Sequence, residues 1–245
     1  MATFTTFSNF LPDPTHPITK AGDLSVPLGT PGPGFSAVGF QSITDTQVSR
    51  TVSGRGVTRD GGSQHYEFTI SYNPMFRYQF DPVDTFLAGR NPRKEPFYVV
   101  LPQYSKPKNA AYATLVLTSV PTVVASYDPG VSKILITNTT SSTAATPLPG
   151  DMFNIIDSGD FNHQKIYKIT RVETYDYYQA GAGQPAANQF RIHFSPPLQR
   201  ATVAGATVMF TNPKFRVITK SDVQEHNLNT DNLYTFSLAL EEIQP

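Results

Sequence analysis

The segment DSGDFNHQK, residues 157–165, is the one stretch of this chain whose side chains are close enough in sequence to support chemistry. Asp157, Asp160, Asn162 and His163 could supply oxygen and nitrogen ligands to a cation, or Asp160 and His163 could form an acid–base pair. A calcium loop needs oxygen ligands at alternating positions, a central glycine and a distal glutamate, and the segment fits only in part. Asp, Ser, Gly and Asn also form the commonest tight turns. We predict a turn here, with no metal ion and no catalytic residue.

Other catalytic signatures do not occur in the sequence. There is no GxSxG nucleophile motif and no HExxH zinc motif, and GTPGPG at residues 29–34 has prolines where a phosphate-binding helix should begin. The absence of cysteine excludes disulfides, thiol catalysis and cysteine-bound zinc. His65 and His193 fall at outward positions of alternating segments, where we expect surface histidines. The sequence predicts a protein that is not an enzyme and needs no cofactor.

Charge and hydropathy exclude two classes of partner. The 19 basic and 19 acidic residues balance to a formal net charge of zero, without the dense basic patch that nucleic-acid binding requires. The N-terminus has neither a basic region nor a continuous apolar run, and no segment approaches the roughly 18 apolar residues that span a bilayer. We therefore predict no membrane partner, no sequence-specific nucleic-acid partner, and synthesis in the cytoplasm.

Residues 1–45 are rich in proline and glycine, which disfavour helix and central strand. The same segment carries large apolar side chains that are unusual in a solvated linker. These candidate interface residues are Phe4, Phe7, Phe10, Leu11 and Phe35. Two interpretations remain open: an extended arm that lies against another subunit, or a coil that packs on its own domain.

The remaining chain, residues 46–245, predicts an all-β domain. Period-two alternation of apolar and polar residues is typical of half-buried strands, and turn residues separate the segments at short intervals. The clearest expected strands are residues 46–54, 63–75, 96–104, 112–120, 131–137, 164–174, 189–198 and 232–245. A turn is expected at RDGGSQ (residues 59–64), and one short helix at residues 81–89, begun by Asp81 and Pro82 and ended by Gly89. We predict a β-barrel or sandwich of about nine to eleven strands, with a loop-rich insertion near residues 106–150.

Two alternating segments far apart in the sequence have matching patterns. Residues 65–72 and the closing segment NLYTFSLALEEIQP (residues 232–245) each place large apolar side chains on one face. We expect the closing strand to lie beside residues 65–72 in one sheet. The acidic pair Glu241 and Glu242 would then discourage further pairing at the sheet edge.

The order of several short motifs resembles structural proteins of bacteriophage tails. The resemblance covers residues 48–105 and 148–243, with Asn73 standing where proline is expected and Tyr66 where tryptophan is common. In the first range it includes GGSQHYEFTISYNPM followed by the short helix. In the second range the matching positions are Gly150, Asp151, His163, Lys165, Tyr167, Thr170, Pro196, Pro197, Asp222, Gln224, Asp231, Tyr234, Phe236 and Glu241.

This resemblance implies a structural virion protein without catalytic activity. It implies a barrel or sandwich that assembles into a homo-oligomeric, commonly hexameric, ring at the distal tail or baseplate hub. Such a ring joins the tail tube to the baseplate or fibres, contacts other tail and baseplate proteins, and is assembled in the host cytoplasm. Two alternatives remain: a neck or head–tail connector component, and a carbohydrate-binding tail module that would use exposed tyrosines such as Tyr177 and Tyr178.

Overall fold

A computed structural model gives the fold of the chain, and it divides the described residues into two compact units. It describes residues 9–17, 31–89, 91–137, 145–157, 165–221, 226–229 and 231–243, without the side chains of residues 60–63. Unit 1 takes the chain up to Val99 and again from Arg216, and unit 2 takes Val100–Phe215. The sequence predicts instead an arm at residues 1–45 and one domain at residues 46–245. Alternation indicates strands but not which strands share a core, so it could not indicate this division.

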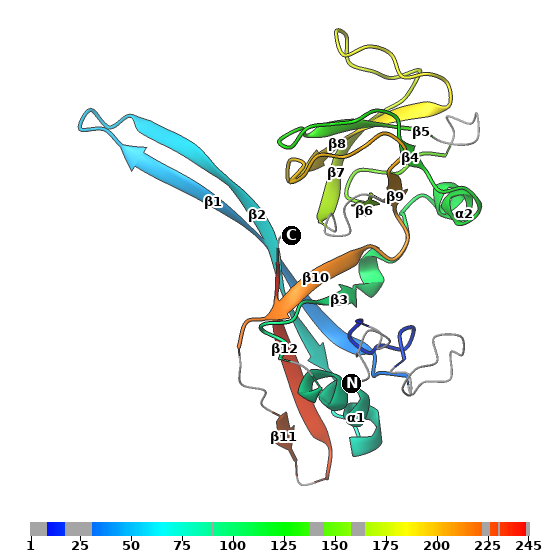
Figure 1. The fold of residues 1–245 in the computed structure, drawn as a ribbon. Helices are drawn as coiled ribbons and strands as arrows, with labels where there is room; N and C mark the ends of the chain where they lie inside the picture. The colour runs from blue at the N-terminus through cyan, green and yellow to red at the C-terminus, as the bar shows by residue number, and fades with distance from the viewer. Residues whose placement is uncertain are drawn as a thin grey trace, which may run out of the picture. The chain divides into compact units, whose positions relative to one another are not determined.

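Unit 1 is built on a sheet whose strands come from both ends of the chain (Figure 1). In spatial order the strands are β1 (Phe35–Arg50), β2 (Gly56–Tyr72), β12 (Tyr234–Glu242), β10 (Lys214–Thr219) and β3 (Phe97–Val100), with β11 (His226–Leu228) paired to β12. β12 runs antiparallel to β2, with Leu238 opposite Ile70 and Leu240 opposite Phe68. The expected pairing of the closing strand with residues 65–72 is confirmed.

The expected role of the acidic pair at the end of β12 is wrong, because β12 lies between β2 and β10 and is not an edge strand. Glu241 faces Glu67 on β2 and Ile218 on β10. Glu242 is buried, and its carboxylate accepts a hydrogen bond of 3.1 Å from the Tyr66 backbone N–H. The Glu242 side chain therefore bonds to the β2 backbone inside the sheet and is not presented at an edge.

Helix α1 (Arg77–Ala88) begins about one turn before the start that Asp81 and Pro82 predict. The Gln79 side chain accepts a hydrogen bond of 3.1 Å from the Phe76 N–H and so satisfies one of the free amides at the helix start. Gly89 follows the last residue, as the sequence predicts. The buried face of the helix consists of Phe80, Pro82, Val83, Phe86 and Leu87.

The described part of the N-terminal segment packs on unit 1 itself. The Leu11 N–H donates to the Tyr98 carbonyl of β3, the Tyr98 N–H donates to the Asn9 carbonyl, and both bonds are 2.8 Å long. Leu11 is 1% exposed. Gly32 crosses so close to Pro12 that an added Cβ would overlap the Pro12 backbone. Residues 9–17 and 31–34 therefore follow the second of the two open interpretations, a coil packed on its own unit.

Unit 2 is a closed antiparallel barrel, which confirms the all-β fold class. In order around the barrel, its strands are β4 (Thr122–Val123), β5 (Lys133–Thr137), β8 (Gln189–Ser195), β7 (Ile166–Glu173), β6 (Met152–Ile156) and β9 (Thr207–Met209). Inward side chains fill the interior, with Phe153 edge-on to Phe194 at 5.5 Å between ring centroids. The one-turn helix η2 (Pro102–Tyr104) belongs to the same stretch of chain. The described residues form twelve strands, slightly more than predicted.

Residues 112–120, predicted as a strand, contribute instead to a second helix, α2 (Ala110–Thr118). The Asn109 side chain accepts hydrogen bonds from the Ala111 and Tyr112 N–H groups and caps the helix start. Tyr112 and Val116, one turn apart, are its buried residues. The region near 106–150, expected to be rich in loops, thus contains α2, β4 and β5. An apolar run of this length fits a strand or a helix equally well. Here the Asn109 cap favours the helix.

The hydroxyl of Tyr112 provides a test of barrel packing. It is buried and has no hydrogen-bond partner within the described residues, whereas the buried Tyr167 hydroxyl accepts a 3.2 Å bond from the Gln199 N–H. An unpaired buried hydroxyl loses hydration without compensation, so Tyr112→Phe should raise the free energy of unfolding by about 1 kcal/mol. The matched Tyr167→Phe should lower it by about 1 kcal/mol. Urea titration followed by circular dichroism checks both, and equal losses would contradict the assignment.

Candidate functional site

The outer part of the β1–β2 hairpin, residues 44–59, is exposed along its whole length, and we call it the distal hairpin. β1 and β2 pair from Phe35 opposite Tyr72 to Arg50 opposite Gly56. β12 pairs with β2 only between Glu67 and Ser71. Beyond that point the two strands continue as a two-stranded ribbon that projects from the sheet (Figure 1, cyan).

Every residue of the distal hairpin is exposed. Its three valines, Val48, Val52 and Val57, are 66%, 110% and 52% exposed. β-Branched residues favour strands, but a ribbon without a third strand or a covering layer buries neither face. Val48 of β1 and Val57 of β2 therefore contribute to strand formation without contributing to a core, and Val52 lies between the two strands.

The turn of the distal hairpin lies at residues 51–55, before the turn that RDGGSQ predicts. The Thr51 N–H donates to the Arg55 carbonyl at 3.0 Å, and the Gly54 N–H donates to the Thr51 carbonyl at 2.9 Å. Gly54 has φ +82°, a conformation that suits glycine. The RDGGSQ segment is instead part of β2, where the register shifts between the pairs Thr44–Gln64 and Thr46–Asp60. Its glycines accommodate extra residues within the strand, as in a β-bulge.

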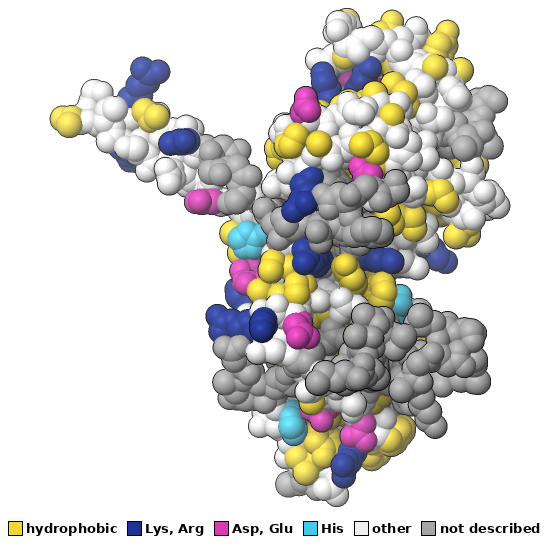
Figure 2. All heavy atoms as spheres, in the orientation of Figure 1, with side chains coloured by type: hydrophobic (Ala, Val, Ile, Leu, Met, Phe, Trp, Pro, Cys, Tyr) yellow, Lys and Arg dark blue, Asp and Glu magenta, His cyan; other side chains and the backbone are white. Residues whose placement is uncertain are grey.

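The distal hairpin is basic as well as apolar. It contains Arg50, Arg55 and Arg59 and one acidic residue, Asp45. Figure 2 shows basic and hydrophobic side chains interspersed along the projecting ribbon. Arginine beside exposed apolar side chains is typical of protein–protein interfaces.

Of the predicted interface residues, the three that the structure describes lie outside the distal hairpin. Phe4 and Phe7 lie outside the described residues. Phe10 forms a bridge with Tyr98 of β3, and Leu11 is buried. Phe35 is the first residue of β1, and its ring meets the Tyr72 ring edge-on at 5.7 Å. The three described residues contact their own unit. The distal hairpin was not predicted from the sequence, because Gly61 and Gly62 indicated a turn at residues that belong to β2.

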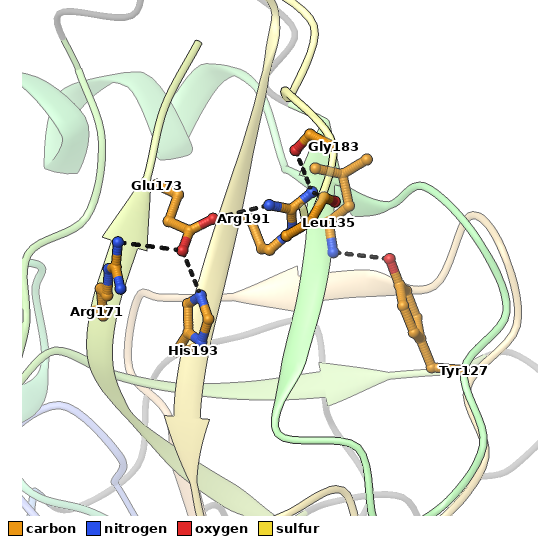
Figure 3. A network of polar contacts seen from close by, with 8 residues as sticks. Tyr127, Leu135, Arg171, Glu173, Gly183, Arg191 and His193 are labelled. Carbon is orange, nitrogen blue, oxygen red and sulfur yellow. Dashed lines mark hydrogen bonds and ion pairs between the residues drawn. The ribbon is translucent and has the colours of Figure 1, made fainter. Parts of the chain in front are cut away.

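The barrel of unit 2 holds a buried ion pair centred on Glu173 (Figure 3). Glu173 is the last residue of β7 and is 0% exposed. Its carboxylate contacts Arg191 at 2.7 Å and His193 at 2.9 Å, both on β8, and Arg171 at 3.4 Å. His193 is therefore half-buried and engaged, and the prediction of a surface histidine at this position is wrong.

The same ion pair holds a loop that carries three exposed tyrosines. Arg191 also donates to the carbonyls of Ala182 and Gly183, at 2.7 and 2.8 Å. This loop, residues 174–188, which we call the tyrosine loop, displays Tyr175, Tyr177 and Tyr178 at 44%, 81% and 44% exposure. Because Arg191 bonds to the loop backbone, the loop conformation depends on the barrel.

The electrostatics of Glu173 favour an anchoring role. Burial alone raises the pKa of its carboxyl, but hydrogen bonds from Arg191 and His193 outweigh this effect, so the pKa lies below its ordinary value. One carboxylate oxygen contacts Arg191, and the other contacts His193 and Arg171. In this arrangement the carboxylate stabilises the loop and is not presented to a substrate.

The segment 157–165 is described only at its two ends. Asp157 is buried and accepts a hydrogen bond of 3.2 Å from the Val203 N–H, while Asp160, Asn162 and His163 lie outside the described residues. Within the part of the chain that the structure describes, no group of three or more His, Asp or Glu side chains is placed to hold a metal ion. No helix in that part has the length and apolar character to cross a membrane.

Several residues that carry the tail-protein resemblance have structural roles in the barrel. Gly150 has φ +90° and donates to the Ile169 carbonyl at 2.7 Å. Asp151 is buried and accepts bonds from the Leu148 and Lys108 N–H groups. Lys165 is buried as well. Gly150 and Asp151 therefore position the backbone at the start of β6.

Comparisons with known proteins identify no family. No family model matches the chain, and no curated protein sequence matches it. Function is therefore argued from the two surfaces described above and from the resemblance of the sequence motifs.

Glu173 offers a test of the loop anchor. Glu173→Gln removes the buried charge that Arg191 and His193 require, and should lower the free energy of unfolding by about 2 kcal/mol. It should also increase hydrogen exchange in residues 174–188. The control is Arg171→Gln, because that arginine is 55% exposed and 3.4 Å away, and it should cost no more than about 0.5 kcal/mol.

The contacts of Glu173 also predict how the free energy of unfolding depends on pH in the acid range. A carboxyl with a lowered folded-state pKa stabilises the fold above its unfolded value, near 4.5, and loses this contribution as the pH falls through the lower folded value. The difference in unfolding free energy between the wild-type chain and Glu173→Gln should therefore shrink as the pH falls below about 5. A difference that stays constant to pH 3 would contradict the assignment.

Proposed function

We propose that this chain is a structural protein of a bacteriophage tail that assembles into a ring at the distal tail or baseplate hub. In this role it joins the tail tube to the baseplate or fibres through contacts with other tail proteins. The proposed role of the chain is structural, and it includes no catalysed reaction. The resemblance of residues 48–105 and 148–243 to tail proteins supports the virion assignment.

The observation that carries the assembly role is the exposure of the distal hairpin. An isolated two-stranded ribbon is marginally stable in water, and open strand edges are templates for pairing. β1 is the end strand of its sheet within the described residues, and all three hairpin valines are more than half exposed. A partner that covers this ribbon would bury apolar side chains that folding leaves in water.

A shortened hairpin tests the assembly role. Thr44 and Gln64 are register partners, so residues 45–63 can be replaced by Asn-Gly, which forms a two-residue hairpin turn. We expect light scattering to give a ring mass, such as that of a hexamer, for the full chain and the mass of one folded chain for the shortened variant. A shortened variant that keeps the ring mass would exclude the distal hairpin from assembly.

The virion assignment is tested on particles of the phage that encodes this chain. Antibody labelling should mark the distal end of the tail. Labelling at the neck would replace this assignment with a head–tail connector. Mass spectrometry that finds no copy of the chain in purified particles would overturn the virion role.

A second candidate function, carbohydrate binding, is favoured by the tyrosine loop. Exposed aromatic rings on a pre-organised backbone provide a stacking surface for sugars at low entropic cost. The loop backbone is held by Arg191 and by mutual hydrogen bonds of 2.8 and 3.2 Å between Thr174 and Tyr177. This candidate is compatible with a tail protein that also contacts a glycan.

Glycan arrays test the second candidate. Binding should be lost in Tyr177→Ala and retained in Tyr78→Ala, a control that is 68% exposed in unit 1. Equal binding by both variants, or no binding by the wild-type chain, would exclude the tyrosine loop as a sugar site.

A further inference from the structure

The end of unit 1 around α1 is an exposed surface with the opposite charge to the distal hairpin. Two aromatic side chains at the helix start, Phe76 and Tyr78, are 53% and 68% exposed and stack with ring centroids 6.0 Å apart. Leu228 of β11 is 55% exposed. Met75 bridges to Tyr234, which in turn pairs with Leu228, so β11 and the start of α1 belong to the same end of the sheet.

The charges at this end are mainly acidic. Asp81 and Asp84 lie on α1, and Asp231 lies in the turn between β11 and β12. Arg77 offsets part of this charge through a 3.6 Å contact with Asp81. We call this set the α1 end; its members are Phe76, Tyr78, Asp81, Asp84, Leu228 and Asp231. Figure 2 shows hydrophobic and acidic side chains gathered over α1 and β11.

The distal hairpin and the α1 end are complementary. The hairpin presents three arginines and one aspartate around three exposed valines. The α1 end presents three aspartates and one arginine around two aromatic rings and a leucine. Opposite charge gives orientation and specificity, and the apolar side chains at the centre provide burial.

One chain cannot bring these two surfaces together. The distal hairpin ends at Arg59 and the α1 end begins at Phe76, so residues 60–72 of β2 lie between them. At about 3.3 Å per residue, an extended strand of this length spans roughly 40 Å. Pairing with β12 and β1 keeps β2 extended, so a contact between the two surfaces must join different copies.

We propose that the distal hairpin of one copy docks on the α1 end of a second copy of this chain. This inference rests on the proposed function, and it specifies the partner and the two contact surfaces. The contact is heterologous, since two different surfaces meet, and repetition of such a contact closes a ring when the rotation between copies allows it. The described part of the N-terminal segment plays no part in it.

Charge reversal tests the docking. One variant carries Arg50→Glu, Arg55→Glu and Arg59→Glu, and the other carries Asp81→Lys, Asp84→Lys and Asp231→Lys. Each variant alone places like charges at the contact, so its association should weaken by about a hundredfold or more. Light scattering should then give the 26.9 kDa of one chain, with circular dichroism confirming the fold.

Mixing the two variants restores opposite charges at every contact, because each hairpin then meets a surface of the other variant. The mixture should form rings with an even number of subunits and an alternating composition, which native mass spectrometry resolves. Assembly by either variant alone, or no assembly by the mixture, would overturn the docking.

Disulfide crosslinking tests the contact directly, because the chain has no cysteine of its own. A chain with Val52→Cys and Tyr78→Cys should form a ladder of covalent oligomers under mild oxidation. The control combines Val52→Cys with Leu117→Cys, a residue that is 71% exposed on α2, and should give no ladder. A ladder of equal intensity in the control would overturn the docking.

The outcomes separate this inference from the proposed function. A wild-type chain that stays monomeric at high concentration, together with antibody labelling at the tail tip, would exclude the docking and leave the tail role in place. Restored assembly in the mixture, together with absence of the chain from phage particles, would support the docking and exclude the tail role.

Discussion

The pairing of β12 with β2 is the constraint on which unit 1 depends. It joins residues from the two ends of the chain and buries Phe68 and Ile70 against Leu238 and Leu240. The pairing stops at Glu67, whereas β1 and β2 continue together to Arg50 and Gly56. The point where β12 ends therefore separates a hairpin base held in a sheet from an outer ribbon exposed on both faces.

In unit 2 the ion pair of Glu173 with Arg191 and His193 joins segments in a similar way. It lies on the outward side of strands β7 and β8 and connects them to the tyrosine loop. The inward residues of β8 fill the core, while outward Arg191 and His193 converge on Glu173. Arg191 also donates hydrogen bonds to two backbone carbonyls of the tyrosine loop. A buried carboxylate is costly without such partners, so the loop and the two strands stabilise one another. The residues of the tail-protein resemblance in this unit, such as Gly150 and Asp151, likewise hold backbone in place.

The distal hairpin and the tyrosine loop are two of the surfaces to which we assign binding, and folding leaves most of their side chains in water. Hydrogen bonds define the backbone of each. The distal hairpin was not among the predicted interface residues, whereas Tyr177 and Tyr178 of the tyrosine loop were predicted to bind sugar in the carbohydrate-binding alternative. Large apolar residues in a proline-rich segment indicated either an interface arm or a coil packed on its own domain, and Leu11 is buried against its own unit. A sequence shows that a side chain is apolar and does not show which chain covers it.

Local patterns were sufficient for several strands and for the all-β class. Alternation predicted β2, β7, β8 and β12, and even the proximity of β2 to β12, because two strands with the same buried face can share one core. Tertiary structure alone decided the rest: the division into two units, the buried position of Glu242, the helix at residues 110–118 and the projecting ribbon. Each of these depends on which distant segment lies alongside. The periodicity of a single segment carries information about which of its faces is buried, but none about the partner that buries it.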